Sequence, residues 1–306
     1  MKQIGTGFLL TLMALVGCAQ KSETIKISTN PNTLLWKISG NGLEKASYLF
    51  GTIHMLCEDD AVLSANLKKA IKNAEDVYLE VDMDNIMEMF GVMGQMKMTG
   101  DTTLQDLLTK EEYEKVKDYF ESKQSMIPFA MLETFKPILA ASTLEQGDLP
   151  CESTSSMEQV IMAEAKQQEK SIKGLETMSY QAGMLDSIPY KLQAQQLVNY
   201  INNVGKEDDG KETKEMLKAY NEQDLNKLEE MIKKSDAGIS SFTDLLLYNR
   251  NRNWVKKLKK LMAEKPLLVA VGAGHLPGDQ GVINLLRKAG YTVEPVENKV
   301  SKTKEI

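Results

Sequence analysis

The chain has 306 residues, of which 42% are hydrophobic and 26% are charged, a composition that predicts a packed core and excludes a wholly disordered protein. Its formal net charge is −6 and no basic stripe runs along it, which argues against a nucleic-acid partner.

The N-terminus has the pattern of an export signal. A lysine precedes an apolar run over residues 4–16, which is shorter than the roughly 20 residues that a membrane-spanning helix needs. The stretch ending in Gly17-Cys18 resembles a bacterial lipobox, in which cleavage exposes a cysteine that is then acylated; an ordinary secretory signal with a chance cysteine is the alternative. We expect residues 1–17 to be removed, Cys18 to carry lipid and the polar stretch 18–32 to be a tether. The protein would then lie in the bacterial cell envelope, on the extracytoplasmic side, held to the membrane by this lipid alone.

Strand patterns cluster at both ends of the domain that follows, residues 33–298, and helical patterns fill an insertion over about 85–262. Asn41-Gly42 between the first two strands is a hairpin signal. The predicted strands cover residues 34–38, 46–54, 77–81, 171–176, 267–271 and 292–296. The predicted helices cover residues 61–74, 110–121, 156–169, 189–203, 211–220, 224–233, 239–262 and 279–289, the last with Asp279 as its N-cap. These elements predict an α/β (α+β) fold, a mixed sheet built from N- and C-terminal segments with a large helical insertion, followed by a polar tail over 299–306.

Three cysteines occur, and if Cys18 carries lipid, Cys57 and Cys151 remain. An oxidising compartment favours a disulfide between them, although two free thiols are the alternative because sequence does not give their geometry.

The chain has only two histidines, and both follow a glycine by three residues at the predicted end of a strand. His54 ends Gly51-Thr52-Ile53-His54, and His275 ends Gly272-Ala273-Gly274-His275. Ligands of α/β sheets bind beyond the carboxyl ends of strands, and glycine lets the backbone approach a ligand closely. We therefore expect Gly51, Gly272 and Gly274 to contact a substrate there.

Glu80 interrupts the apolar strand pattern 77–81, and burying a lone carboxylate is costly unless it is paired or binds metal. His54, Glu80 and His275 together predict a three-ligand metal site that leaves room for an activated water. Taken singly, each residue could instead be structural: a hydrogen-bonded histidine, or a glutamate on the solvent face. Glu80 could also act as general base.

Two further features have competing interpretations. Arg250 and Asn251 could orient a substrate carboxylate or stabilise an oxyanion, but the sequence alone favours a solvated helix face. Methionines gather between positions 83 and 98, where they could bind Cu(I), fill a core, or form a lid or peptide-contacting surface. They are Met83, Met87, Met89, Met93, Met96 and Met98.

These segments together resemble the TraB/GumN family, which is related to the Tiki metalloproteases and more distantly to ChaN-like proteins. The resemblance covers about residues 34–296 and is carried by five matching stretches. They are residues 49–54, residues 78–82, residues 173–177 with Gln181, Arg250-Asn251 with Trp254, and residues 271–278 with Gly281. It implies that His54, Glu80, Arg250 and His275 are active-site residues and that a divalent ion, Mn, Co or Zn, is the cofactor. The family usually has an acidic residue before its Arg-Asn pair; Asn249 stands here, so the partner of Arg250 is left open.

The sequence thus favours a lipid-anchored, metal-dependent hydrolase that acts on peptide or protein substrates. The alternatives are a non-catalytic lipoprotein that binds peptide, haem or iron in the same cleft, and a scaffold whose helical insertion binds a partner protein.

Overall fold

The computed structural model describes residues 32–123, 127–145, 149, 151, 153–206, 210–234 and 241–300. All of them belong to one compact unit that begins at Pro31. The predicted signal peptide, Cys18, nearly all of the tether and residues 301–306 of the predicted tail lie outside the described residues. Within the described ranges, no helix has the length and apolar character that crossing a membrane requires.

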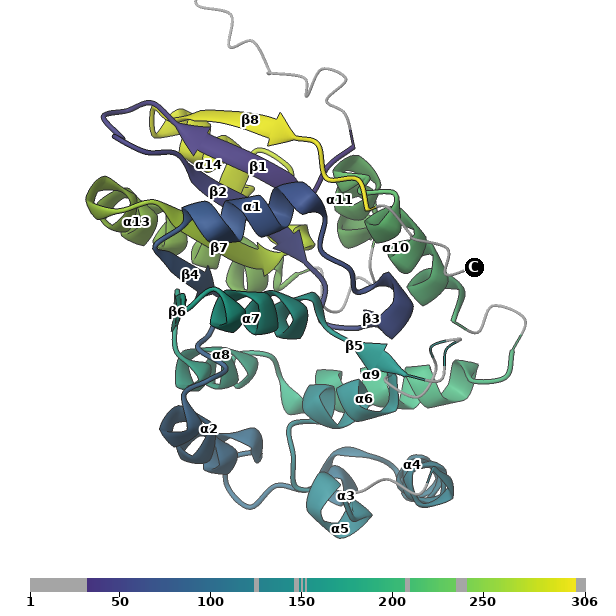
Figure 1. Ribbon diagram of the computed structural model, residues 1–306. Helices are drawn as coiled ribbons and strands as arrows, with labels where there is room; N and C mark the ends of the chain where they lie inside the picture. Colours follow the sequence, from purple (N-terminus) through teal and green to yellow (C-terminus); the bar gives the residue numbers. More distant parts are fainter. Residues whose placement is uncertain are drawn as a thin grey trace, which may run out of the picture. The chain divides into compact units, whose positions relative to one another are not determined.

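A six-stranded mixed sheet in the order β6-β4-β7-β2-β1-β8 forms the centre of the fold (Figure 1). Strands β2, β7, β4 and β6 are mutually parallel neighbours, whereas β1 is antiparallel to both β2 and β8. The predicted hairpin joins β1 to β2, with Asn41 and Gly42 at φ of 49° and 82°. The strands are β1 (Leu35–Ser39), β2 (Ser47–Thr52), β4 (Asp76–Leu79), β6 (Ser171–Gly174), β7 (Leu267–Gly272) and β8 (Thr292–Val296).

Helices cover both faces of this sheet, because successive strand side chains point to opposite faces and both faces are apolar. On β7, Leu268 and Ala270 join the core beneath α1, α7, α10 and α11. Val269 and Val271 join the core beneath α13 and α14 on the other face. The helices that complete these layers are α1 (Ala65–Asn73), α7 (Met157–Gln167), α10 (Lys211–Asn221), α11 (Leu225–Lys234), α13 (Asn249–Glu264) and α14 (Val282–Lys288).

The insertion builds a third, separate hydrophobic core, to which Leu104, Phe120, Leu132 and Leu197 contribute. The helices of the insertion that do not cover the sheet lie below it in Figure 1. They are α2 (Ile86–Val92), α3 (Leu104–Leu107), α4 (Lys110–Ser122), α5 (Phe129–Leu132), α6 (Pro137–Glu145), α8 (Met178–Leu185) and α9 (Tyr190–Asn203). Short 3₁₀ turns cover Glu58–Asp60, Met93–Met96 and Ala273–His275, and a π-helical turn covers Asp244–Tyr248.

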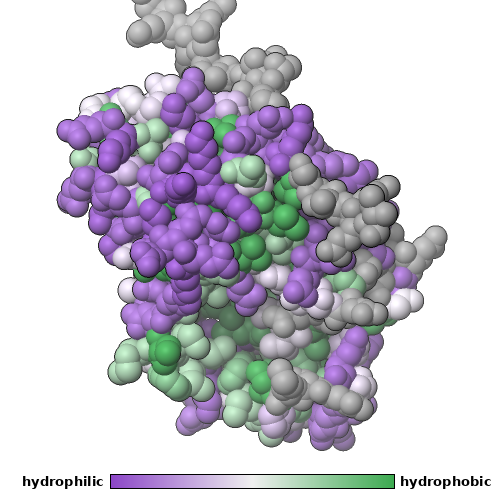
Figure 2. Space-filling model, in the orientation of Figure 1, coloured by the Kyte–Doolittle hydropathy of each residue, from purple (hydrophilic) through white to green (hydrophobic). Residues whose placement is uncertain are grey.

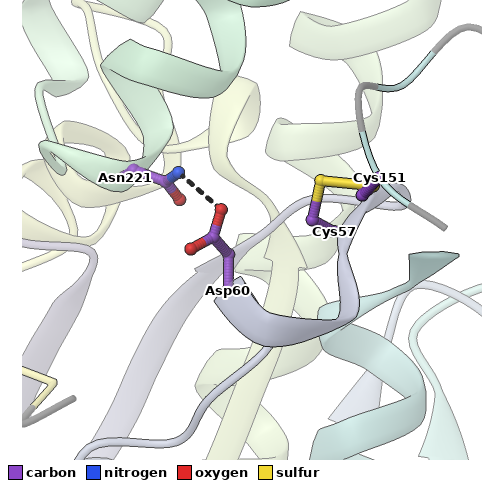
Figure 3. The surroundings of a disulfide bond; sticks show 4 residues. All are labelled: Cys57, Asp60, Cys151 and Asn221. Atoms are coloured by element: carbon purple, nitrogen blue, oxygen red, sulfur yellow. Dashed lines mark hydrogen bonds between the residues drawn. A yellow bond between two sulfur atoms is a disulfide. The ribbon is translucent and has the colours of Figure 1, made fainter. Parts of the chain in front are cut away.

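The predicted disulfide between Cys57 and Cys151 is present and ties the insertion to the chain just after His54 (Figure 3). Beside it, β3 (Leu56–Cys57) pairs with β5 (Thr154–Ser155), and Asn221 Nδ2 donates to Asp60 Oδ2 over 3.2 Å. The link closes a separation of 94 residues, which in the chain-entropy treatment stabilises the fold by at most about 4–5 kcal/mol.

The predicted fold class is confirmed, and the differences concern individual elements. Asp279 is not an N-cap: the turn Gly278–Gly281 delays the helix, whose N-cap is Gly281. The predicted helix 61–74 begins only at Ala65, after its N-cap Ser64. Strand β4 ends at Leu79, so Glu80 follows the strand instead of interrupting it. Helices α2, α3, α5, α6 and α8 were not predicted individually.

Candidate functional site

Four neighbouring parallel strands end at one edge of the sheet, and an ionisable residue follows each of them there. In sheet order these are Glu176 after β6, Glu80 after β4, His275 after β7 and His54 after β2. Backbone hydrogen bonds keep the first two side by side, since Glu176 N donates to Glu80 O over 2.9 Å. The carboxyl edge of the parallel strands is therefore the candidate site.

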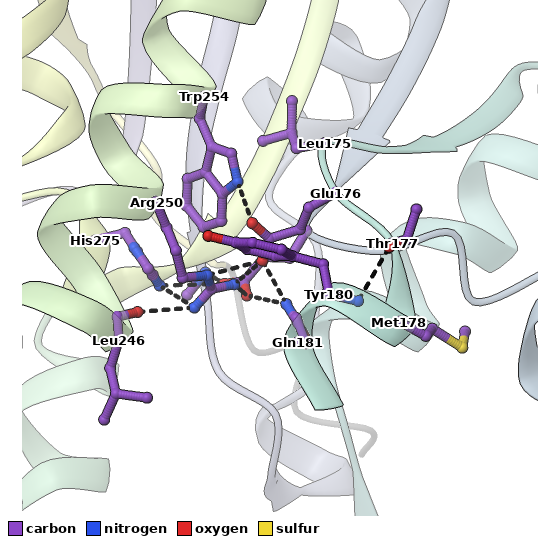
Figure 4. A network of polar contacts seen from close by, with 12 residues as sticks. Leu175, Glu176, Thr177, Met178, Tyr180, Gln181, Leu246, Arg250, Trp254 and His275 are labelled. Carbon is purple, nitrogen blue, oxygen red and sulfur yellow. Dashed lines mark hydrogen bonds and ion pairs between the residues drawn. The ribbon is translucent and has the colours of Figure 1, made fainter. Parts of the chain in front are cut away.

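Arg250, in the first turn of α13, is the centre of a buried polar network at this edge (Figure 4). Its Nη2 donates to Glu80 Oε2 over 2.5 Å and to Glu176 Oε1 over 2.5 Å, while Nε also donates to Glu176 Oε1 over 2.8 Å. Its Nη1 donates to Leu246 O over 3.0 Å and lies 3.2 Å from His275 Nε2. All five guanidinium N–H groups are thus engaged, and Glu80 and Glu176 are the partners of Arg250 that the sequence left open.

The second carboxylate of this network, Glu176, is held by three side chains from two helices. Its Oε2 accepts from Trp254 Nε1 over 2.9 Å, and Gln181 Nε2 bridges Glu176 Oε1 at 2.9 Å and Glu80 Oε2 at 3.1 Å. The guanidinium of Arg250 also stacks over the Trp254 ring, with Cζ 4.7 Å from the centroid. Because the buried charges of Arg250, Glu80 and Glu176 are paired and hydrogen-bonded, none of them carries the desolvation penalty of an unpaired buried ion.

His275 is buried and held in one tautomer. Asn251 Nδ2 donates to the carbonyls of His275 and Gln280, so Asn251 Oδ1 must accept the Nδ1–H of His275, over 2.6 Å. Nε2 is then left as an acceptor for Arg250. Burial, assisted by the charge of Arg250 and opposed by Glu80, lowers the pKa of His275 to about 3, so the ring is neutral at physiological pH.

Glu80 is ionised despite its burial. Burial raises its pKa, but the charges of His275 and Arg250, the N–H of Gly272 and the charge of His54 outweigh this and hold the pKa at about 2. Since His275 is neutral above its own pKa, Arg250 and the Gly272 N–H, 2.8 Å from Glu80 Oε1, carry most of this effect at neutral pH.

His54 differs from His275 in exposure, since 75% of its side chain is accessible to solvent. Its Nδ1 lies 2.9 Å from Glu158 Oε1, and this close carboxylate raises the pKa of His54 to about 8, against the effect of burial. The charges of Glu80 and Arg250 also affect the pKa of His54, which follows β2 at the same edge of the sheet.

The three predicted metal ligands meet at this edge but do not fit a shared ion as they stand. Across the described stretches of residues 32–300, no group of three or more His, Cys, Asp or Glu side chains is placed to hold a metal. The cationic guanidinium of Arg250 also occupies Glu80 Oε2 and His275 Nε2, whose lone pairs a metal would use. The metal ligand set therefore stays a prediction.

With this geometry described, comparison with known proteins identifies the family. The model of the TraB/PrgY/gumN family matches residues 34–295, nearly all of the described domain. The chain belongs to the TraB/PrgY/gumN family.

Relatives of this family member include Metalloprotease TIKI2 of Xenopus tropicalis and Metalloprotease TIKI1 of Homo sapiens, each 23% identical to it. Each alignment covers 86% of this chain, which spans only 60% and 62% of the length of these two relatives. The uncharacterized protein YbaP of Shigella flexneri is 24% identical, over 79% of this chain and 88% of its own length. No solved structure matches the chain.

In this member of the TraB/PrgY/gumN family, the predicted substrate-binding residues lie within the site but have close protein neighbours. A Cβ at Gly51 would come 3.1 Å from Ala273, and one at Gly272 would come 3.2 Å from Glu80 Oε1, so both glycines permit close packing. A Cβ at Gly274 would meet the Ile232 side chain. Asn251 is only 1% exposed and holds His275. Contact of these four residues with a substrate stays a prediction.

The methionine cluster divides between core and surface. Met98 is buried and Met96 packs against the third core, whereas Met83, Met87, Met89 and Met93 are exposed. Ile86 and Phe90 are exposed with them at 62% and 68%. Figure 2 shows apolar side chains gathered at the lower left, where α2 lies in Figure 1. Exposed apolar surface of this kind is typical of an interaction site, and α2 begins only six residues after Glu80.

Sequence reasoning missed Glu158 and the role of Glu176. Glu158 had a readable signal: in the predicted helix 156–169 it falls on the same face as Ile161 and Ala165, at a spacing that buries it. Glu176 was part of a matching stretch, but its partners Arg250 and Trp254 come from a helix far along the chain.

Proposed function

We propose that this protein hydrolyses peptide bonds of peptide or protein substrates at the carboxyl edge of its parallel strands. The observation that carries the proposal is an exposed His54, to whose Nε2 no described residue forms a hydrogen bond, at the same sheet edge as the buried network of Arg250, Glu80 and Glu176. Relatives named metalloproteases support the reaction class. The exposed apolar side chains of α2, close to Glu80 in the chain, support a substrate with apolar side chains.

The chemistry follows from what each group is free to do. The described residues form no hydrogen bond to His54 Nε2, so in its neutral form this nitrogen can take a proton from water as the water oxygen attacks the peptide carbonyl carbon. When the carbon–nitrogen bond breaks, the same nitrogen can return the proton to the departing amine. The products are a carboxylic acid and an amine, between which a proton then passes to give a carboxylate and an ammonium ion, and the neutral histidine is regenerated.

The buried network acts as a scaffold in this proposal. Arg250 has no unengaged N–H, so it holds Glu80, Glu176 and His275 in place. A role of Arg250 in binding a substrate carbonyl would require one of these bonds to open.

Metal dependence is implied by the names of the relatives, and the ion would be Mn, Co or Zn. A divalent ion would supply an activated water and a polarised carbonyl. Because Arg250 occupies the lone pairs of Glu80 and His275, no step above is routed through a metal.

We further propose that the protein is anchored by lipid on Cys18 at the extracytoplasmic side of a bacterial membrane. The lipobox-like sequence before Cys18 supports this location, and so does the Cys57–Cys151 disulfide, since such bonds persist in oxidising compartments.

Incubation of the purified protein with a peptide library, followed by mass spectrometry, tests the proposal. Wild type should cleave, His54→Ala should not, and Glu164→Ala, which removes a carboxylate of α7 away from the site, should cleave like wild type. Parallel samples with a chelator, and with Mn²⁺, Co²⁺ or Zn²⁺ restored, measure metal dependence separately. Binding of peptides without turnover would replace the hydrolase with the non-catalytic binder.

A further inference from the structure

A buried carboxylate lies directly behind the exposed histidine of the site. Glu158 is only 5% exposed, whereas 75% of the His54 side chain is accessible, and 2.9 Å separates Glu158 Oε1 from His54 Nδ1. Glu158 belongs to the helical insertion, and none of the predicted site residues is its neighbour in sequence.

The backbone fixes Glu158 at this position. It is the second residue of α7, whose N-cap Ser156 accepts from Gln159 N, and the N–H of Met157 donates to Ile53 O over 3.1 Å. That bond ties the start of α7 to the residue before His54. The first turn of a helix also favours a negative charge, because its N–H groups point toward it.

Among the described residues, His54 is the one charged group within ion-pair distance of Glu158. Within the described parts of the chain, neither oxygen of Glu158 has a hydrogen bond of good geometry, and the Thr52 hydroxyl, a second neighbour that lowers the pKa of Glu158, has none either. A buried carboxylate with few partners is costly, so its presence calls for an explanation, and a catalytic role is one.

Both histidines of the chain have a side-chain oxygen close to Nδ1, but the two oxygens belong to different chemical groups. His275 Nδ1 faces an amide oxygen, that of Asn251, and the ring stays neutral. His54 Nδ1 faces a carboxylate, which stabilises the imidazolium that forms when Nε2 takes a proton. The acceptors thus separate a structural histidine from a reactive one.

We propose that Glu158 is the positioning residue of His54: its carboxylate accepts the Nδ1–H, fixes the ring and leaves the unprotonated Nε2 directed at the substrate. This inference rests on the proposed hydrolase function for its purpose, but the arrangement itself can be measured without any substrate.

Side-chain ¹H–¹⁵N correlation spectra give the tautomer of each histidine, and with only two histidines His54→Asn assigns both signals. The spectra are recorded at about pH 10, where neutral imidazole dominates. In wild type, His54 should carry its proton on Nδ1. In Glu158→Met, which keeps the length of the side chain but removes the acceptor, His54 should move toward the Nε2–H form that free imidazole side chains prefer in water. His275 should keep its Nδ1–H form and report that the fold is intact.

Glu164→Met is the matched control, because Glu164 lies on the same helix and pairs with Lys68 instead of a histidine. It should leave both tautomers unchanged. A wild-type His54 protonated on Nε2, or a tautomer unaffected by Glu158→Met, would overturn the proposal, whether or not the protein cleaves peptides.

Kinetics then separate positioning from substrate binding. Glu158→Met should lower kcat by about 10²-fold, the lower end of what proton transfer by a positioned side chain contributes. KM should change less than about threefold, because uniform substrate binding is not affected. A loss confined to KM would contradict the positioning role. A wild type with the expected tautomer but no cleavage would instead refute the hydrolase and leave the pair of His54 and Glu158 established.

Discussion

Replacement of Arg250 by methionine tests whether the buried network holds the site together. The arginine side chain is 8% exposed, and those of Glu80 and Glu176 are 11% and 9% exposed. Arg250→Met would leave both carboxylates buried with only neutral donors, chiefly Gln181, Trp254 and the Gly272 N–H. Removing one partner of a buried ion pair costs about 3–5 kcal/mol, so the free energy of unfolding at pH 7 should fall by about that amount.

The pH dependence of this loss distinguishes lost charge pairing from lost packing. In wild type, the pKa of Glu80 is held at about 2, below its unfolded value, so its contribution to stability is present at neutral pH and is lost as pH falls through the folded pKa. In Arg250→Met the pKa of Glu80 should rise, and protonation then removes the unpaired buried charge. The difference in unfolding free energy between wild type and Arg250→Met, the stability gap, should therefore narrow as pH falls from about 7 toward about 4.

Urea unfolding followed by far-ultraviolet circular dichroism, with the disulfide intact, measures this gap. Arg252→Met is the control, because Arg252 donates to the neutral side chains of Gln280 and Asn249. This replacement should lower the free energy of unfolding by only about 0.5–1.5 kcal/mol. An Arg250→Met loss no larger than that of the control, or a gap that stays constant with pH, would refute the reasoning.

Three further predictions concern stability and location. Lys173 and Lys265 pair with the buried Asp76 and, against the effect of burial, lower its pKa; the stability from this group is present above the unfolded pKa and lost as pH falls through the folded one. Asp76→Asn should therefore flatten the acid side of the curve of unfolding free energy against pH, and an unchanged curve would contradict this. Loss of the disulfide in Cys57→Ser/Cys151→Ser should lower the free energy of unfolding by up to about 4–5 kcal/mol, whereas equal urea midpoints for variant and wild type would show that the link is not stabilising. Cys18→Ser should release the protein from the membrane fraction and abolish acyl labelling, and persistence of both would exclude the lipid anchor.

The sheet could be predicted from the sequence because its strands carry local signals. The hairpin at Asn41-Gly42 and the apolar run of β7 each depend on neighbouring residues only. The placement of His54, Glu80 and His275 at one edge could also be predicted from the sequence. All three come at or just after strand ends, and the carboxyl ends of parallel strands lie together.

The partners of these residues could not be predicted, because they depend on how distant segments fold back. Glu158 reaches His54 from the insertion, and Arg250 reaches Glu80 across 170 positions of sequence. The start of α14 was misplaced for a related reason: the turn Gly278–Gly281 is so tight that a Cβ at Gly281 would meet Pro277 O at 2.0 Å, and the pattern of apolar residues does not reveal such a turn.

Peptide cleavage in ¹⁸O-labelled water, compared between wild type and His54→Ala, tests the central claim most directly. Water attack on the peptide carbonyl places one water oxygen in each new C-terminal carboxylate, which mass spectrometry detects as a labelled fragment. We predict labelled fragments from wild type and none from His54→Ala. Fragments that appear equally with both proteins, or intact peptides with both, would contradict hydrolysis at this site.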